Sequence, residues 1–307
     1  MNVVAITGAT SMIGISIINS CLEHNVSKIY AIVRNNCDKL NRLPDNDRIK
    51  VIKCNADKYL SLVELIHEKC DVFYHIAWSL TGQNRNNDLI EQVRNIQYTI
   101  EAVKAASELG CEVFIGAGSQ AEYGLCSDKK ISPDSPVNPT QPYGIAKYAA
   151  GKMAMQQANK MGINCIWVRI FSVYGIWEKP NTLIQSTINQ LRRGEIPQLT
   201  KGIQLWDYLF SEDAGEAFCL IGEKIRENKI YCLGSGIAKP IKTYIEEVRD
   251  IVNPSMELQF GKVPYTSNSI MNLCANISSL TRDIGWVSKT GFKAGIEKTY
   301  HFLKDMK

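Results

Sequence analysis

The chain has 307 residues, of which 45% are hydrophobic and 21% are charged. This composition supports a packed core and excludes an intrinsically disordered chain, and the length predicts about two domains. Its 35 basic and 31 acidic residues are spread along the chain and leave a net charge of +4, which argues against a nucleic-acid-binding protein. No segment has the ~20 consecutive apolar residues of a membrane-spanning helix, and the N-terminus has no signal-peptide pattern. We therefore expect a cytoplasmic protein that does not bind membranes.

Cysteine and histidine are placed irregularly in the sequence. The ten cysteines form no C-x-x-C pair, and the four histidines have no spacing typical of metal ligands. We therefore expect free thiols in a reducing compartment and no metal site.

Apolar periodicity alternates between strand and helix patterns along the chain. Strands are predicted over residues 2–7, 28–33, 49–54, 72–76, 112–115, 164–170, 229–233 and 258–260. Helices are predicted over residues 12–23, 60–68, 89–109 and 143–161. This order predicts an α/β protein of the Rossmann type, in which a doubly wound parallel sheet has a ligand crevice at the carboxyl ends of its strands.

The first predicted strand ends in TGATSMIG, where Gly8 and Gly14 flank the start of a helix. Glycine lets the backbone turn sharply and approach a pyrophosphate, and a helix N-terminus offers amide donors to the anion. Ser11 occupies the position of the usual middle glycine and retains a hydroxyl donor. The alternative is a plain strand-to-helix turn without a ligand.

Arg34 follows the second predicted strand, 20 residues after Gly14. An acidic residue at this distance would accept hydrogen bonds from the ribose 2′-hydroxyl of NAD, whereas an arginine suits the 2′-phosphate of NADP. We therefore expect NADP(H) to be preferred, with NAD(H) still possible. The alternative is an arginine that is solvated at the surface.

Tyr143 and Lys147 are four residues apart in YGIAK and would share one face of a helix. A free phenol has a pKa of about 10, so an adjacent lysine cation and an oxidised nicotinamide would both favour the phenolate that acid–base catalysis requires. Ser119, in a loop about two dozen residues upstream, is predicted to hydrogen-bond a substrate oxygen beside Tyr143. A surface helix and a turn serine are the alternatives.

Eight segments occur in the order found in the extended short-chain dehydrogenase/reductase family. They are TGATSMIG, HIAW (75–78), Asn95, GSQAEYG (118–124), PYGIAK (142–147), RIFSVYG (169–175), WDYLFSEDA (206–214) and LGSG (233–236) with DIGW (283–286). The chain resembles the nucleotide-sugar epimerases, dehydratases and 4-ketoreductases of this family.

The resemblance implies a dinucleotide-binding Rossmann domain and a smaller lobe for a nucleoside diphosphate sugar. We expect residues 1–174, with part of about 203–233, to form the first, and about 175–202 and 234–307 to form the second. The implied catalytic residues are Ser119, Tyr143 and Lys147. The implied cofactor-binding residues are Gly8, Ser11, Met12, Ile13, Gly14, Arg34, Asn35, Asn55, Ala56, Ala77, Tyr143 and Lys147. Substrate contacts are expected from Gln120, Ser172, Trp206 and Arg282.

Departures from the family pattern narrow the expected reaction. The 4,6-dehydratases have an acidic pair where this chain has Gln120 and Ala121, so dehydration is not expected. A 4-ketoreductase and a 4-epimerase remain, and Arg34 favours the reductase because a net reduction uses NADPH. A non-catalytic dinucleotide sensor is a third, remote alternative. The resemblance also implies a homodimer formed through the helices over 89–109 and 143–161.

Overall fold

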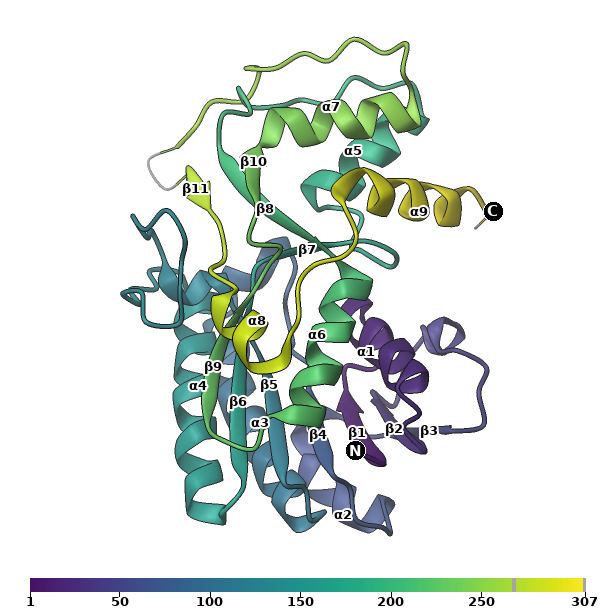
Figure 1. Cartoon of the computed structure of the whole chain (residues 1–307), viewed down its shortest axis with the longest axis vertical. Helices are drawn as coiled ribbons and strands as arrows, with labels where there is room; N and C mark the ends of the chain where they lie inside the picture. The colour runs from purple at the N-terminus through teal and green to yellow at the C-terminus, as the bar shows by residue number, and fades with distance from the viewer. Residues whose placement is uncertain (267–268, 306–307) are drawn as a thin grey trace.

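Seven parallel strands form a sheet in the order β3-β2-β1-β4-β5-β6-β9 (Figure 1). The computed structural model describes residues 1–266 and 269–305. The strands are β1 (Val3–Thr7), β2 (Lys28–Val33), β3 (Ile49–Lys53), β4 (Val72–His75), β5 (Val113–Ser119), β6 (Asn164–Ile170) and β9 (Lys229–Leu233). The inner strands read as nearly continuous apolar runs because helices cover both faces of the sheet. The predicted Rossmann-type fold is confirmed.

Two helical layers cover this sheet. On one face, α1 (Met12–Glu23) packs against α6 (Ser211–Lys224), and α8 (Ser278–Ile284) adds to the same apolar cluster. On the other face, α3 (Leu89–Glu108) packs against α4 (Pro142–Met161) through small side chains such as Ala102 and Ala150. The sheet thus lies between two apolar interfaces with helices, and the loops at the carboxyl ends of its strands remain available for ligands.

A second, smaller sheet is built around β8 (Leu205–Phe210). Its other strands are β7 (Ser172–Tyr174), β10 (Ala238–Pro240) and β11 (Asn272–Leu273). Helices α5 (Leu183–Arg192), α7 (Ile241–Val252) and α9 (Phe292–Asp305) enclose the apolar cluster beside it, above the large sheet in Figure 1.

Two local predictions differ from the structure. The helix predicted over 60–68 shrinks to α2 (Leu62–Leu65), because Ile66 takes an extended conformation and buries its side chain. Residues 258–260, predicted as a strand, form none, and the strand β8 was not predicted. The predicted free thiols agree with the structure, in which all ten cysteines are unbridged. Within the described ranges, no helix is long and apolar enough to cross a membrane.

Candidate active site

The loop between β1 and α1 is a tight turn in which two glycines make close backbone contacts. Gly8 has φ +67°, and a Cβ atom there would lie 2.8 Å from the backbone nitrogen of Ala77. A Cβ on Gly14 would lie 2.3 Å from the carbonyl oxygen of Gly8. Ser11 caps α1, since its hydroxyl accepts a hydrogen bond from the Gly14 N–H at 3.1 Å. The first turn of α1, which contains Met12 and Ile13, therefore offers backbone N–H groups to an anion, as a dinucleotide requires.

Five other predicted cofactor-binding residues follow the ends of neighbouring strands: Arg34, Asn35, Asn55, Ala56 and Ala77. The Asn35 N–H donates to the side-chain oxygen of Asn55 at 3.0 Å and so joins the ends of β2 and β3. The Ala77 N–H donates to the Thr7 hydroxyl at 3.3 Å, which holds the end of β4 beside the glycine loop. Arg34 is exposed directly beyond β2. These residues line one carboxyl edge of the parallel sheet, where dinucleotides bind in such folds.

Tyr143 lies in the first turn of α4, and Lys147 lies one turn further along. The Lys147 side chain is buried, and its Nζ donates to the carbonyl oxygen of Ala117 in β5 at 2.7 Å. The same Nζ lies 3.6 Å from the ring centroid of Trp78 and 5.9 Å from that of Tyr143. The lysine is thereby fixed between α4 and the sheet.

Tyr143 is held from several sides. Its ring meets Trp78 edge-on at 6.1 Å, and the Arg85 guanidinium lies 4.9 Å from its centroid. Its backbone N–H donates to the Asn86 side chain at 3.2 Å. The Ser119 hydroxyl lies close enough to the phenol to lower the pKa of Tyr143. The structure thus brings together the three side chains that the sequence analysis selected for catalysis.

The electrostatics of this group differ from the sequence-based expectation. Burial raises the pKa of Tyr143, against the smaller lowering effects of the Ser119 hydroxyl and the Arg85 charge. Burial also lowers the pKa of Lys147 to about 7, partly offset by Glu122. The Lys147 ammonium donates to Ala117 and lies over the Trp78 ring, 5.9 Å from the ring centroid of Tyr143. Among the protein's own groups, Ser119 and Arg85 favour the phenolate.

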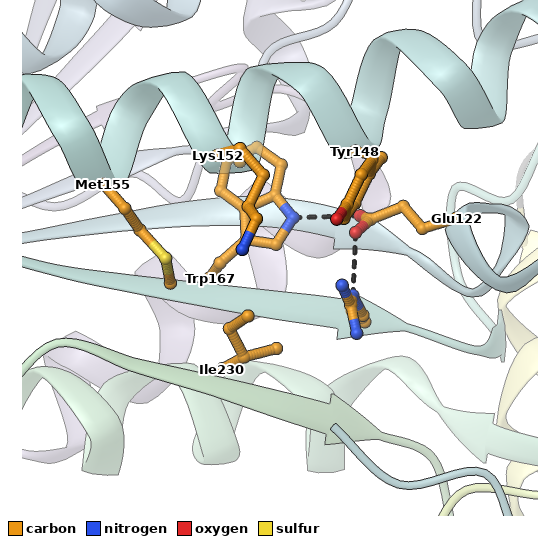
Figure 2. Close-up of a pocket in the computed structure, with 8 residues that line it drawn as sticks. Glu122, Tyr148, Lys152, Met155, Trp167 and Ile230 are labelled. Carbon is orange, nitrogen blue, oxygen red and sulfur yellow. Dashed lines mark hydrogen bonds and ion pairs between the residues drawn. The ribbon is translucent and has the colours of Figure 1, made fainter. Parts of the chain in front are cut away.

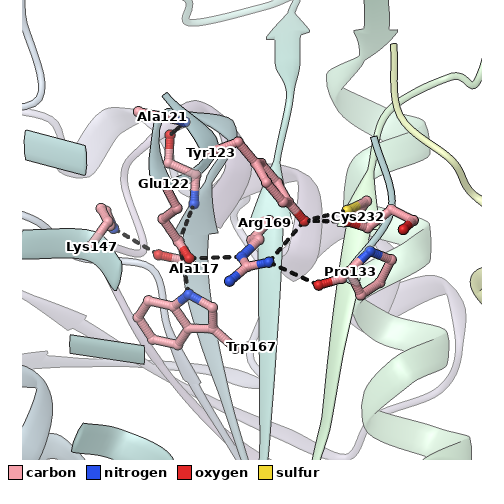
Figure 3. A network of polar contacts seen from close by, with 11 residues as sticks. Ala117, Ala121, Glu122, Tyr123, Pro133, Lys147, Trp167, Arg169 and Cys232 are labelled. Atoms are coloured by element: carbon pink, nitrogen blue, oxygen red, sulfur yellow. Dashed lines mark hydrogen bonds and ion pairs between the residues drawn. The ribbon is translucent and has the colours of Figure 1, made fainter. Parts of the chain in front are cut away.

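Glu122 and Arg169 form a buried ion pair next to the end of β5 (Figure 3). One Glu122 oxygen accepts the backbone N–H of Ser119 and the indole N–H of Trp167, both at 2.9 Å. The other accepts from the Arg169 guanidinium at 2.7 Å, and the two charged side chains are only 1% and 3% exposed. Glu122 was not predicted from the sequence, although the serine-to-glutamate spacing in SQAE is that of a capping box, which the structure contains.

The network continues from Arg169 across the sheet. Arg169 donates to the Tyr123 hydroxyl at 2.8 Å and to the Pro133 carbonyl at 3.2 Å. Tyr123 in turn donates to the carbonyl of Ser132 at 2.7 Å and lies 3.1 Å from the Cys232 sulfur. The ion pair is therefore tied to β6, to β9 and to the loop that follows η4 (Gln120–Tyr123).

The indole of Trp167 fills the space between the sheet and α4. Figure 2 shows Lys152 and Met155 of α4 on one side of it and Ile230 of β9 on the other. A Cβ on Gly151 would lie 2.7 Å from this indole. The close packing of α4 on the sheet therefore fixes the position of the helix that carries Tyr143 and Lys147.

The four predicted substrate-contacting residues are not all brought together. The Trp206 indole N–H donates to the Ser172 hydroxyl at 2.7 Å, so these two residues of β8 and β7 form a pair. Among the described residues, the side-chain oxygen of Gln120 is buried without a hydrogen-bond partner. Arg282 lies on α8 beside the edge strand β9, exposed and paired with Asp283, and does not join the others.

Two polar residues of the family motifs have structural contacts. The ring nitrogens of His75 lie 3.0 Å and 3.3 Å from the hydroxyls of Thr7 and Thr99, and burial lowers the pKa of His75 to about 3. Asn95 exchanges hydrogen bonds with the backbone of Ser79. These contacts give both residues a structural role.

Comparisons with known proteins give consistent results. The human dTDP-D-glucose 4,6-dehydratase is 26% identical over 217 residues, which are 69% of this chain and only 62% of that protein. The UDP-glucose 4-epimerase of Mycolicibacterium smegmatis is 22% identical over 311 residues, covering 98% of each chain.

Solved structures share the whole fold. A UDP-N-acetylglucosamine 4-epimerase from Methanobrevibacter ruminantium, in complex with UDP-N-acetylmuramic acid, superposes with a TM-score of 0.89 at 19% identity, covering 100% of this chain and 99% of that chain. For the UDP-glucose 4-epimerase of Thermotoga maritima with UDP-glucose, the TM-score is 0.86 at 18% identity, with the same coverage. Residues 4–234 match the family described as NAD dependent epimerase/dehydratase. The chain belongs to this family, as its sequence motifs predicted.

Proposed function

We propose that the protein is an NADP(H)-dependent oxidoreductase that reduces the C4 ketone of a nucleoside diphosphate 4-keto-6-deoxyhexose. The observation that carries the proposal is the convergence of Ser119, Tyr143 and Lys147 beside the glycine loop of a dinucleotide-type fold. Membership of the epimerase/dehydratase family supports a nucleotide sugar as the substrate.

The residues at the carboxyl edge of the large sheet fit a dinucleotide. Gly8 and Gly14 leave space that a Cβ atom would fill, and the N-terminus of α1 favours a pyrophosphate. A bound NADPH would supply the hydride for the reduction. Lys147, already beside Tyr143, would contact the nicotinamide ribose.

In the proposed reaction, Tyr143 donates its phenolic proton to the C4 oxygen. Ser119 hydrogen-bonds the same oxygen and orients the carbonyl, and Arg85 stabilises the phenolate that results. The raised pKa of Tyr143 keeps the phenol protonated at neutral pH, as a general acid must be. Proton transfer of this kind contributes roughly 10²–10⁴-fold to the rate.

The proposed preference for NADP(H) rests on Arg34. Its exposed side chain lies just beyond β2, next to Asn35, where an NAD-specific protein would have an acidic residue. Titration of the purified protein with NADPH and NADH tests it. We expect NADPH to bind more tightly and Arg34→Ala to reduce that difference, whereas tighter binding of NADH to the unmodified protein would contradict the preference.

A second candidate is an NAD-dependent nucleotide-sugar 4-epimerase. It is favoured by the similarity to the M. smegmatis UDP-glucose 4-epimerase over 98% of both chains. The same three side chains would serve it, because epimerisation requires oxidation and then reduction at C4. Gln120 and Ala121 still argue against dehydration, since neither side chain can transfer a proton.

Mass spectrometry of reaction mixtures separates the two candidates. The protein is incubated with NADPH and a panel of nucleotide 4-keto-6-deoxy sugars, and in parallel with NAD and UDP-glucose. A gain of two hydrogens by one keto sugar supports the reductase. Conversion of UDP-glucose to its C4 epimer supports the epimerase instead. This conversion is detected by chromatography, because the mass does not change.

The catalytic assignment is tested with Tyr143→Phe, which keeps the ring and removes the proton donor. We expect the rate of the active reaction to fall by roughly 10²–10⁴-fold while the affinity for NADPH changes little. Unchanged oxidation of NADPH by the variant would refute the role of Tyr143.

The domain division and the dimer belong to the same proposal. Residues 1–174, with part of about 203–233, would hold the cofactor, and about 175–202 and 234–307 would hold the sugar nucleotide. Leu89, Ile90 and Val93 of α3 are each at least 60% exposed, which supports pairing with a second copy of the chain. Sedimentation of the wild type and of Val93→Lys tests the homodimer.

A further inference from the structure

A nitrogen, a sulfur and a carboxylate converge where α1 and α6 pack together. His24 directly follows α1 as its C-cap, and its Nδ1 lies 3.1 Å and 3.2 Å from the two carboxylate oxygens of Glu223. Cys219 lies one turn before Glu223 on α6, so both face α1. The ligand atoms of these three residues all lie within 4.8 Å of one another.

These separations approach those of a metal centre. Zinc–ligand bonds of about 2.0–2.3 Å in tetrahedral geometry place ligand atoms roughly 3.3–3.8 Å apart. The His24–Glu223 distance is already close to that range, and small side-chain rotations would bring the Cys219 sulfur into it. Thiolate, imidazole and carboxylate are the donors that zinc selects in proteins.

One side of the cluster is buried, and the other side is accessible to solvent. Cys219 is fully buried, as is Cys21 of α1, which belongs to the same apolar cluster. The side chains of His24 and Glu223 are each 27% exposed, so a cation can enter from solvent between them.

We propose that His24, Cys219 and Glu223 form a binding site for a divalent cation of the zinc class that links α1 to α6. On binding, the Cys219 thiol releases its proton to solvent, and the imidazole carries its proton on Nε2 so that Nδ1 can coordinate. The thiolate and the carboxylate then balance the two positive charges. A water molecule completes four ligands.

The site is independent of the proposed enzymatic activity. It lies at the end of α1 opposite the glycine loop, so its role would be to hold the cofactor-binding helix against α6. Sequence spacing did not reveal it, because His24 and Glu223 are 199 residues apart and come from different helices.

Cobalt(II) is the probe, because thiolate coordination produces a charge-transfer band in the near ultraviolet. The full-length protein is treated with a chelator, titrated with Co²⁺, and then back-titrated with Zn²⁺. We expect one equivalent to produce the band and Zn²⁺ to abolish it. Zn²⁺ should also raise the melting temperature by at least about 2 °C.

Three variants locate the binding site. Cys219→Ser should abolish the charge-transfer band, and Glu223→Gln, at a partly exposed position that tolerates substitution, should weaken Co²⁺ binding at least about tenfold. Cys165→Ser is the matched control, because Cys165 is equally buried but lies in the apolar cluster on the other face of the sheet. The proposal is refuted if the wild type gives no band, if Cys219→Ser retains it, or if Cys165→Ser loses it to the same extent.

Discussion

Lys147 carries an amino group that the fold holds away from water. Its depressed pKa means that the folded chain binds fewer protons than the unfolded chain between about pH 7 and the usual lysine pKa of about 10.4. The cost of burying this group is therefore greatest below pH 7 and disappears as the pH rises towards 10. Lys147→Met should stabilise the protein at pH 7, and the gain should shrink by up to about 1.4 kcal/mol per pH unit.

Urea denaturation at pH 7 and pH 9 measures this dependence. Lys152→Met, at an exposed position of the same helix, should show a difference from wild type that does not vary with pH. A difference for Lys147→Met that is the same at both pH values would contradict the burial argument.

Glu122 and Arg169 form a buried ion pair, so removing either charge leaves the other one buried and unpaired. Glu122→Gln keeps the shape of the side chain but leaves the buried Arg169 guanidinium without its counter-charge. We expect the free energy of unfolding to fall by about 3–5 kcal/mol, as for other buried pairs broken on one side. Chemical denaturation measures the loss.

Glu227→Gln is a suitable control for that experiment, because Glu227 pairs with Lys229 at the surface. Its effect should be small, since exposed pairs contribute little. An equal loss of unfolding free energy for the two substitutions would show that the buried Glu122–Arg169 pair contributes no more than a surface pair.

At the level of elements, α4 depends on a helical glycine. Alanine normally favours a helix by about 1 kcal/mol over glycine, but a Cβ on Gly151 would overlap the buried Trp167 indole. Gly151→Ala should therefore destabilise the protein by about 1–3 kcal/mol, measured by urea denaturation. In a Trp167→Phe background the cost should be smaller, and an undiminished cost would place the clash elsewhere.

The elements that the sequence predicted best are those with long, regular patterns. The bounds predicted for α1, β2, β6 and β9 agree with the structure, because an apolar period and flanking turn residues define them locally. The strands of the small sheet were missed, since β7, β10 and β11 are only two or three residues long and exist through pairing with β8. Sequence motifs were sufficient to predict Ser119, Tyr143 and Lys147. The partners of Glu122 could not be predicted, because they depend on strand register.

For the molecule as a whole, Asp207 joins the two sheets. It lies in β8, is fully buried, and accepts hydrogen bonds from Ser235 and Gly236 beyond β9 and from Ala275 beyond β11. Asp207→Asn would turn an amide towards these donors. We expect it to lower the free energy of unfolding by about 2–3 kcal/mol.

Thermal denaturation and limited proteolysis measure this effect. Asp207→Asn should make the segment after α7 easier to cleave, because its anchor to the large sheet is weakened. Asp250→Asn, at an exposed partner of Arg249, should behave like the wild type. A variant at position 207 with an unchanged melting temperature and cleavage pattern would refute the anchoring role.

The position of β9 at the edge of the large sheet has a consequence for synthesis on the ribosome. Its partner β6 ends at Ile170 and β9 begins at Lys229, so 58 residues separate them. At roughly 5–20 residues per second, the nascent chain would expose the open edge of β6 for about 3–12 s. During that interval Cys232 has not yet reached Tyr123, and the unpaired strand is open to wrong partners. Slow translation of this stretch should therefore increase aggregation of the newly made protein.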